Sequence, residues 1–231
     1  GDVAGMGADL YESYSGSILA AAALGAAAYL HAEDSSHQQA AVMAPMLIAA
    51  VGILLSIVGI FFVKTKADAT QKDLLASLEK GINISSVLII AASFFILKWL
   101  GLPNYLGIWG AIIVGLLTGI VIGRATAYYT SSEYKPTQHI SENAQTGAAT
   151  VIIAGLGVGF ISTAIPVLAI MLGTSLAYFF AAGSLDLSNI NQGLYGIGIA
   201  AVGMLSTLGI TLATDAYGPI ADNAGGNAEM A

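Results

Sequence analysis

Cysteine is absent from the 231 residues, and charged side chains make up only 9% of them. Without cysteine the chain has no disulfide bonds and no thiolate sites, and its redox compartment is undetermined. A soluble domain carries roughly 25% charged residues. The shortage of charge, together with 56% hydrophobic residues and a mean hydropathy of +0.79, therefore indicates an integral membrane protein.

Basic residues are scarcer still, with 7 Lys and Arg against 14 Asp and Glu and a formal net charge of −7. This balance argues against a nucleic-acid partner, because recognition of a phosphate backbone by protein alone needs basic patches. It does not exclude a phosphate ligand that is held through metal ions. The candidate site residues are therefore to be found among the acids.

Long apolar runs are abundant, and six of them are each long enough to cross about 30 Å of hydrocarbon, which takes about 20 helical residues. The strands of a membrane barrel would alternate and run about ten residues, whereas residues 40–63 are continuously apolar. We therefore predict an all-α fold, a polytopic transmembrane helix bundle that forms one domain over residues 1–231. Its helices are expected at about 3–30, 40–63, 81–100, 105–128, 144–181 and 193–218.

The basic residues are distributed unevenly between the predicted loops. All but Lys98 fall between the second and third or between the fourth and fifth apolar segments: Lys64, Lys66, Lys72, Lys80, Arg124 and Lys135. Loops rich in Lys and Arg stay in the cytoplasm. With six crossings, both ends of the chain are then cytoplasmic, so "GDVAGMGAD" and "DAYGPIADNAGG" are expected on the same side of the membrane.

The first predicted helix begins with acids. On a helix Asp2 and Asp9 share a face, and Glu12 and Ser13 follow Asp9 by one turn. Asp2 would stand about 15 Å along the axis from Glu12, which places Asp2 above the membrane plane and Asp9 with Glu12 at the mouth of the hydrocarbon. An ionisable residue at that depth needs a partner, a cavity or an ion. The alternative is that these acids only face solvent and favour the helix dipole.

A second acidic stretch lies near the other end of the chain. Asp215 and Asp222 are also seven residues apart, and Pro219 between them is expected to bend the helix. The motif Asp-x-Ala-Gly-x-x-Ala followed by an acid occurs at both Asp2 and Asp222, and internal repeats are frequent in ion-coupled membrane proteins. Mg²⁺ takes oxygen ligands and shares its coordination with substrate phosphates. The residues thus predict a cation or magnesium–phosphate site where the two stretches converge at the cytoplasmic end.

The strings "GDVAGMGADLYESY" and "TDAYGPIADNAGGNAEMA" closely resemble two signature stretches of the membrane-integral pyrophosphatases. Members of this family are ion pumps that hydrolyse inorganic pyrophosphate and move sodium ions or protons. The resemblance implies that the six predicted helices are the middle portion of a sixteen-helix fold. The chain would then be an internal fragment, about a third of a family member, and further ligands would lie outside it.

The resemblance also implies roles for individual residues. Asp2 matches the aspartate that helps to orient the attacking water, and with Asp222 and Asn223 it is expected at the Mg²⁺ site. Asp9 matches the acid of a gate beneath the active site, and Glu12 and Ser13 match the ion-binding region. Asp215 matches an acidic residue below Asp222 and is assigned to the translocation path.

The transported ion is expected to be Na⁺, with H⁺ as a possible second ion. Sodium pumps of the family place the gate glutamate three residues after the gate aspartate, as Glu12 follows Asp9 here. Plant-like proton pumps place it seven residues after, where this chain has Gly16. Some bacterial proton pumps share the sodium-pump spacing, so a proton pump stays open as an alternative.

By the same resemblance we expect inorganic pyrophosphate as substrate, Mg²⁺ as cofactor, K⁺ and Na⁺ as possible activators, and a homodimer in the lipid bilayer. The expected location is the bacterial inner membrane, with a cytoplasmic active site. Potassium dependence is decided beyond Ala231. A cation-coupled secondary transporter without hydrolase activity remains the rival reading of acids in membrane helices. A third reading is a purely structural bundle, and the isolated 231 residues are not expected to turn over substrate.

Overall fold

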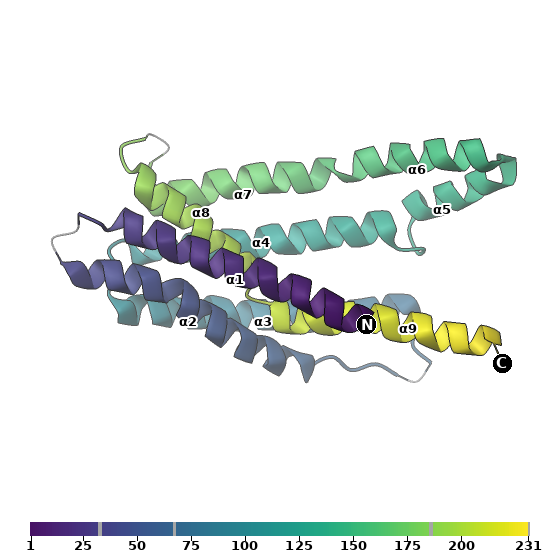
Figure 1. Ribbon diagram of the computed structural model, residues 1–231, viewed down its shortest axis with the longest axis horizontal. Coiled ribbons are helices and arrows are strands. Elements are labelled where there is room, and N and C mark those ends of the chain that lie inside the picture. Colours follow the sequence, from purple (N-terminus) through teal and green to yellow (C-terminus); the bar gives the residue numbers. More distant parts are fainter. Residues whose placement is uncertain (32–33, 67, 185–186, 231) are drawn as a thin grey trace.

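The computed structural model describes residues 1–31, 34–66, 68–184 and 187–230. Over these ranges the chain is helical and contains no strand, which confirms the predicted all-α class. The helices run roughly lengthwise along an elongated bundle (Figure 1). Their bounds are α1 Asp2–Ala28, α2 Ser35–Ile60, α3 Gln71–Leu100, α4 Tyr105–Thr130, α5 Lys135–Asn143, the 3-10 turn η1 Ala144–Thr146, α6 Ala148–Ser162, α7 Ala164–Ala182, α8 Ile190–Leu205 and α9 Leu208–Met230.

Several boundaries differ from the expected ones for local reasons. α3 begins ten residues before residue 81, because Thr70 and Asp73 form a reciprocal capping box at its start. The expected helix 144–181 is interrupted between α6 and α7, where Pro166 leaves the carbonyl of Ser162 without its intrahelical donor. The expected helix 193–218 is likewise divided into α8 and α9.

Four described stretches are long and apolar enough to span a membrane: Ser35–Ile60, Asp73–Leu100, Tyr105–Thr146 and Ala148–Ala182. A fifth results if α8 and α9 count as one bent span. Five of the six expected crossings correspond to these stretches. Residues 3–30 do not, because α1 combines three acids with many weakly hydrophobic Ala, Gly and Ser residues. α1 nevertheless packs along α2, α8 and α9.

Close backbone approaches hold the middle of the bundle together. A Cβ on Gly25 would lie 2.7 Å from the carbonyl oxygen of Ala41, and a Cβ on Gly115 would collide with the carbonyl of Ala200. The Tyr195 hydroxyl, which is 1% exposed, donates to Ala41 O at 3.0 Å. Small residues allow such approaches where lipid supplies no hydrophobic drive between helices. We call this region, around Gly25, Gly115 and Tyr195, the packed centre.

The two ends of the bundle carry different residues. The end of α1 and the start of α2, the end of α3 and the start of α4, and the end of α7 and the start of α8 lie at one end (Figure 1). The start of α1, the end of α2, which Lys64 and Lys66 follow, and the end of α9 lie toward the other (Figure 1). Arg124 and Lys135, near the end of α4 and the start of α5, are on that side as well. The two acidic motifs are therefore on the same side as most of the basic residues.

Candidate functional site

α1 and the broken pair α8–α9 lie side by side and run in opposite directions. Gly25 of α1 lies beside Tyr195 of α8, and a Cβ on Gly198 would lie 2.9 Å from Leu24 Cδ1. Further along, a Cβ on Gly7 would lie 3.8 Å from Leu212 Cδ1 of α9. These contacts set one antiparallel register over the whole length of α1.

That register brings the predicted acids to one end. Asp2 is level with about residue 217, so Asp215 lies about 3 Å and Asp222 about 7.5 Å from it along the axis, at 1.5 Å per residue. Glu12 is level with Thr207, between α8 and α9. We call the group Asp2, Asp9, Glu12, Asp215 and Asp222 the acidic end.

The acids of α1 nevertheless face away from α9. Asp9 follows Gly7, the residue beside Leu212, by two positions, which is about 200° around the helix. Tyr14 on the packed face is buried, and its hydroxyl donates to Ala49 O at 3.2 Å. The four candidates on the other face are exposed: Asp2, Asp9, Glu12 and Ser13. The shared face predicted for these side chains is thus present, but it is open.

The candidates on α9 differ in burial. Asp215 lies one turn beyond Leu212 and is half-buried at the contact with α1. Asp222 and Asn223 are exposed, and the Asn223 amide donates to Pro219 O at 2.7 Å within its own helix. Among the residues described, no three His, Cys, Asp or Glu side chains gather closely enough to hold a metal ion. Oxygen ligands of this kind suit Mg²⁺, but the expected convergence of both motifs on one metal ion is not seen within the described parts of the chain.

Pro219 does not interrupt α9, which runs from Leu208 to Met230. The chain is broken instead between α8 and α9, where the two axes differ by 48°. Ser56 of α2 binds the backbone at this break, and the sequence did not single it out. The only local signals are small and hydroxyl residues at 203–209, which are common throughout the chain.

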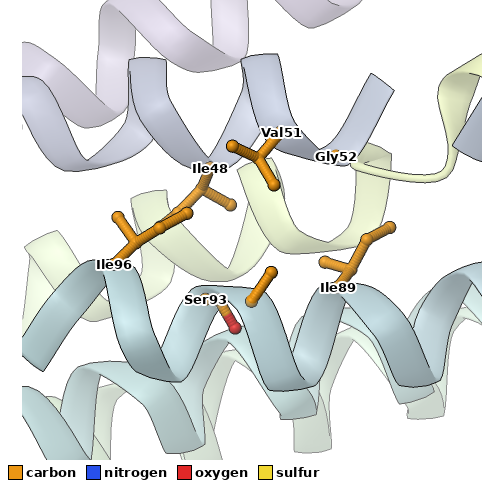
Figure 2. A pocket seen from close by; sticks show the side chains of 7 residues that line it. Ile48, Val51, Gly52, Ile89, Ser93 and Ile96 are labelled. Carbon is orange, nitrogen blue, oxygen red and sulfur yellow. The ribbon is translucent and has the colours of Figure 1, made fainter. Parts of the chain in front are cut away.

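Two hollows in the described residues lie away from the candidates. The first is an apolar crevice between α2 and α3 that is too narrow to hold a water molecule (Figure 2). Its one polar side chain, Ser93, donates to Ile90 O at 3.0 Å and needs no ligand. The second is an open depression of about 490 Å³ along α3 that includes Glu79 and Lys80. Neither is lined by a residue of the acidic end.

The fold and the exposed acids define the class of protein. Apolar helices of spanning length make the chain an integral membrane protein, and ionisable residues at the ends of such helices are typical of ion-handling proteins. The sequence profile of the family described as Inorganic H+ pyrophosphatase matches residues 1–231. The chain therefore belongs to this family of membrane-bound pyrophosphatases, as the two motifs predicted.

Individual relatives differ in the ion that their names state. The chain is 69% identical over 229 residues to a putative K(+)-stimulated pyrophosphate-energized sodium pump of Bacteroides thetaiotaomicron, with 99% of this chain and 31% of the relative covered. It is 38% identical over 246 residues to a K(+)-stimulated sodium pump of Thermotoga maritima, covering 97% and 32%. It is 41% identical over 239 residues to a K(+)-insensitive proton pump of Caldanaerobacter subterraneus, covering 100% and 32%.

The chain thus spans about a third of the length of these relatives. This agrees with the prediction of a fragment.

Proposed function

We propose that these residues belong to a pump that hydrolyses Mg-pyrophosphate and couples the reaction to Na⁺ transport across the membrane. The observation that supports this most is the antiparallel packing of α1 on α8 and α9, which brings both acidic motifs to one end of the bundle. The acids of α1 face outward from the described helices. The remaining two thirds of a polypeptide of the relatives' length would supply the groups that face them.

At this end, Asp2 orients the attacking water, whose oxygen forms a bond to one phosphorus while the bond from that phosphorus to the bridging oxygen breaks. Two phosphates leave, and they carry the two protons of the water. Asp2, Asp222 and Asn223 would offer oxygen ligands to Mg²⁺, and the rest of the ligand shell would come from outside the 231 residues. When bound, the metal neutralises developing charge and activates water. Asp9 acts as the gate below, Glu12 and Ser13 bind the transported ion, and the half-buried Asp215 lies between the two levels on α9.

The choice of Na⁺ is supported by the names of the relatives at 69% and 38% identity, which also mention K⁺ stimulation. A proton pump is the second candidate, because the relative at 41% identity is named as one. Glu12, three residues after Asp9, is the side chain on which the choice would depend.

The orientation follows from charge. The end that carries Lys64, Lys66, Arg124 and Lys135 is assigned to the cytoplasm, because loops rich in Lys and Arg stay inside. This puts the active site on the cytoplasmic face, in our proposal that of a bacterial inner membrane. A homodimer of the complete polypeptide completes the proposal.

The test uses the full-length polypeptide in sealed membrane vesicles with the cytoplasmic face outward. Pyrophosphate and Mg²⁺ should release phosphate and drive ²²Na⁺ into the lumen, and Asp2→Asn should abolish both while the protein still purifies as a folded species. Proton uptake without Na⁺ uptake would identify the proton pump. Ion transport without phosphate release would contradict the proposal and favour a secondary transporter.

A further inference from the structure

The break between α8 and α9 lies inside a stretch that is otherwise apolar enough to be one membrane span. α8 ends at Leu205 and α9 begins at Leu208. An interrupted helix in hydrocarbon needs other partners for the backbone groups that it frees. Proline does not cause this break, since Pro219 lies about three turns further on.

A side chain from α2 bonds the backbone at this break. The Ser56 hydroxyl, which is 0% exposed, accepts a hydrogen bond from Ile210 N at 2.7 Å and donates one to Thr207 O at 3.0 Å. Ile210 N also donates to Thr207 O at 3.1 Å, so the break is a tight turn with the hydroxyl seated in it. Thr207 O also accepts from Thr211 N at 3.1 Å. One side chain therefore adds a second partner to a donor and a further one to an acceptor at the point where the helix axis changes direction, and it ties both groups to α2.

The surroundings of Ser56 leave the break little freedom. A Cβ on Gly52, one turn before Ser56, would lie 2.9 Å from Ser206 O. A Cβ on Gly209 would lie 3.1 Å from both Cβ and Oγ of Ser56. α2 and the break are thus in close contact through a glycine on each side.

The break is also where the acidic end begins. Glu12 is level with Thr207, and everything beyond the break on α9, including Asp215 and Asp222, follows the direction set there. From Tyr217 onward α9 is largely exposed, so within the described residues its course is held at its base, by α1, α2 and α3.

We infer that Ser56 is a positioning residue, whose hydroxyl holds the break between α8 and α9 and thereby sets the direction in which α9 carries Asp215 and Asp222 along α1. Its kinetic consequences rest on the proposed function. The geometric consequence, the placement of α9 beside α1, does not, so the two are measured separately.

The geometric experiment uses the full-length polypeptide with any other cysteines replaced and with the pair Gly7→Cys and Leu212→Cys introduced. The rate of disulfide formation under mild oxidation reports how often α9 lies beside α1. Ser56→Ala should slow cross-linking by up to about fivefold, because the loss of one net hydrogen bond changes the equilibrium constant for the placement of α9 by about that factor. The matched control is Ser93→Ala, which removes an equally buried hydroxyl that bonds only within its own helix, and it should leave the rate unchanged.

The kinetic experiment uses Ser56→Ala without the cysteine pair. It should raise the KM for Mg-pyrophosphate and lower the number of ions moved per pyrophosphate more than it lowers kcat, whereas Ser93→Ala should change neither. If Ser56→Ala does not purify folded, Ser56→Cys, which is close in size and weakens the hydrogen bonds, is measured instead.

Two results would overturn the inference: wild-type cross-linking in Ser56→Ala, or a wild-type KM and coupling ratio in the Ser56 variant. Absence of hydrolysis in the unmodified protein would overturn only the proposed function, and cross-linking would still decide the role of Ser56.

Discussion

The packed centre and the acidic end belong to the same helices, but the first is tightly packed and buried and the second is exposed. At the centre, Gly25, Gly115 and Tyr195 are buried, and backbones approach so closely that a single methyl group would collide. At the acidic end, the carboxylates of Asp2, Asp9 and Asp222 are exposed. The difference indicates that the centre holds this part of the fold, whereas the acids contribute little to packing among the described residues. Substitutions should therefore affect folding in one region and activity in the other.

The largest effect is expected in the packed centre. Gly115→Val should prevent proper folding of the full-length protein, because even its Cβ would collide with the carbonyl of Ala200 in α8. Overpacking of this kind costs about 3 kcal/mol or more. Gly123→Val, on the same helix with nothing within 4 Å, is the control and should fold normally. Size-exclusion chromatography in detergent measures the folded fraction, and equal behaviour of both variants would remove the distinction.

The acidic end should show the opposite behaviour. Asp222→Asn should leave the folded fraction unchanged but lower pyrophosphate hydrolysis about 100-fold or more, because in the proposed site Asp222 holds Mg²⁺, and a bound metal ion contributes several kcal/mol of charge stabilisation. Asp68→Asn, an exposed acid in the connection between α2 and α3, is the matched control and should hydrolyse normally. Near-normal hydrolysis by Asp222→Asn would remove Asp222 from the proposed site.

A smaller effect on stability is expected from the loss of one hydrogen bond in the packed centre. Tyr195→Phe removes the hydrogen bond to Ala41 O without changing the shape of the ring, and it should destabilise the protein by about 1 kcal/mol. Tyr11→Phe, at 74% exposure, should not change stability. Thermal unfolding in detergent, followed by intrinsic fluorescence, compares the two. A Tyr195→Phe protein as stable as the unmodified one would show that glycine packing alone holds the centre.

The smallest effect lies outside both regions, at the start of α2. Asp34 caps this helix by accepting from Ser36 N at 2.8 Å, and hydrogen bonds from the side chain and backbone of Ser36 hold the pKa of the Asp34 carboxyl below its usual range. A lowered pKa means that the stabilisation is present above the unfolded-state pKa and is lost as pH falls through the folded-state pKa. Asp34→Ala should therefore lower the unfolding midpoint slightly at pH 7, and the difference should shrink in acid. A difference that is the same at both pH values would contradict this assignment.

Much of the architecture follows from local patterns in the sequence. Long apolar runs predict the helices, and the all-α class is confirmed because each run satisfies its own backbone groups. The position of both acidic motifs at one end was predicted from an even number of membrane crossings, which puts both ends of the chain on the same side, and from the distribution of Lys and Arg. The family was recognisable from two strings of residues.

The breaks were harder to predict because their causes are not local. Pro219 is the obvious candidate for a bend, yet α9 continues through it, while the bend occurs at Ser206 and Thr207. The hydroxyl that binds this bend belongs to Ser56, 151 residues before Thr207 in the chain. A serine among apolar residues in a predicted helix gives no indication of a partner at that distance.

The direction in which the acidic side chains of α1 point was the other feature that only the tertiary structure could show. Periodicity correctly grouped Asp2, Asp9 and Glu12 on one face, but it could not show whether that face meets α9 or turns from it. Gly7 and Tyr14 occupy the packed face, so the acids turn outward.

Composition and hydropathy alone thus determined that this is a helical membrane protein with carboxylates at one end, because the cost of burying backbone and charge in lipid depends on local sequence. Tertiary structure alone decided which face of α1 is packed, where α8 ends and which hydroxyl holds the turn to α9. Those choices depend on contacts between residues far apart in the chain, where one methyl group or one hydrogen bond decides whether two helices can touch.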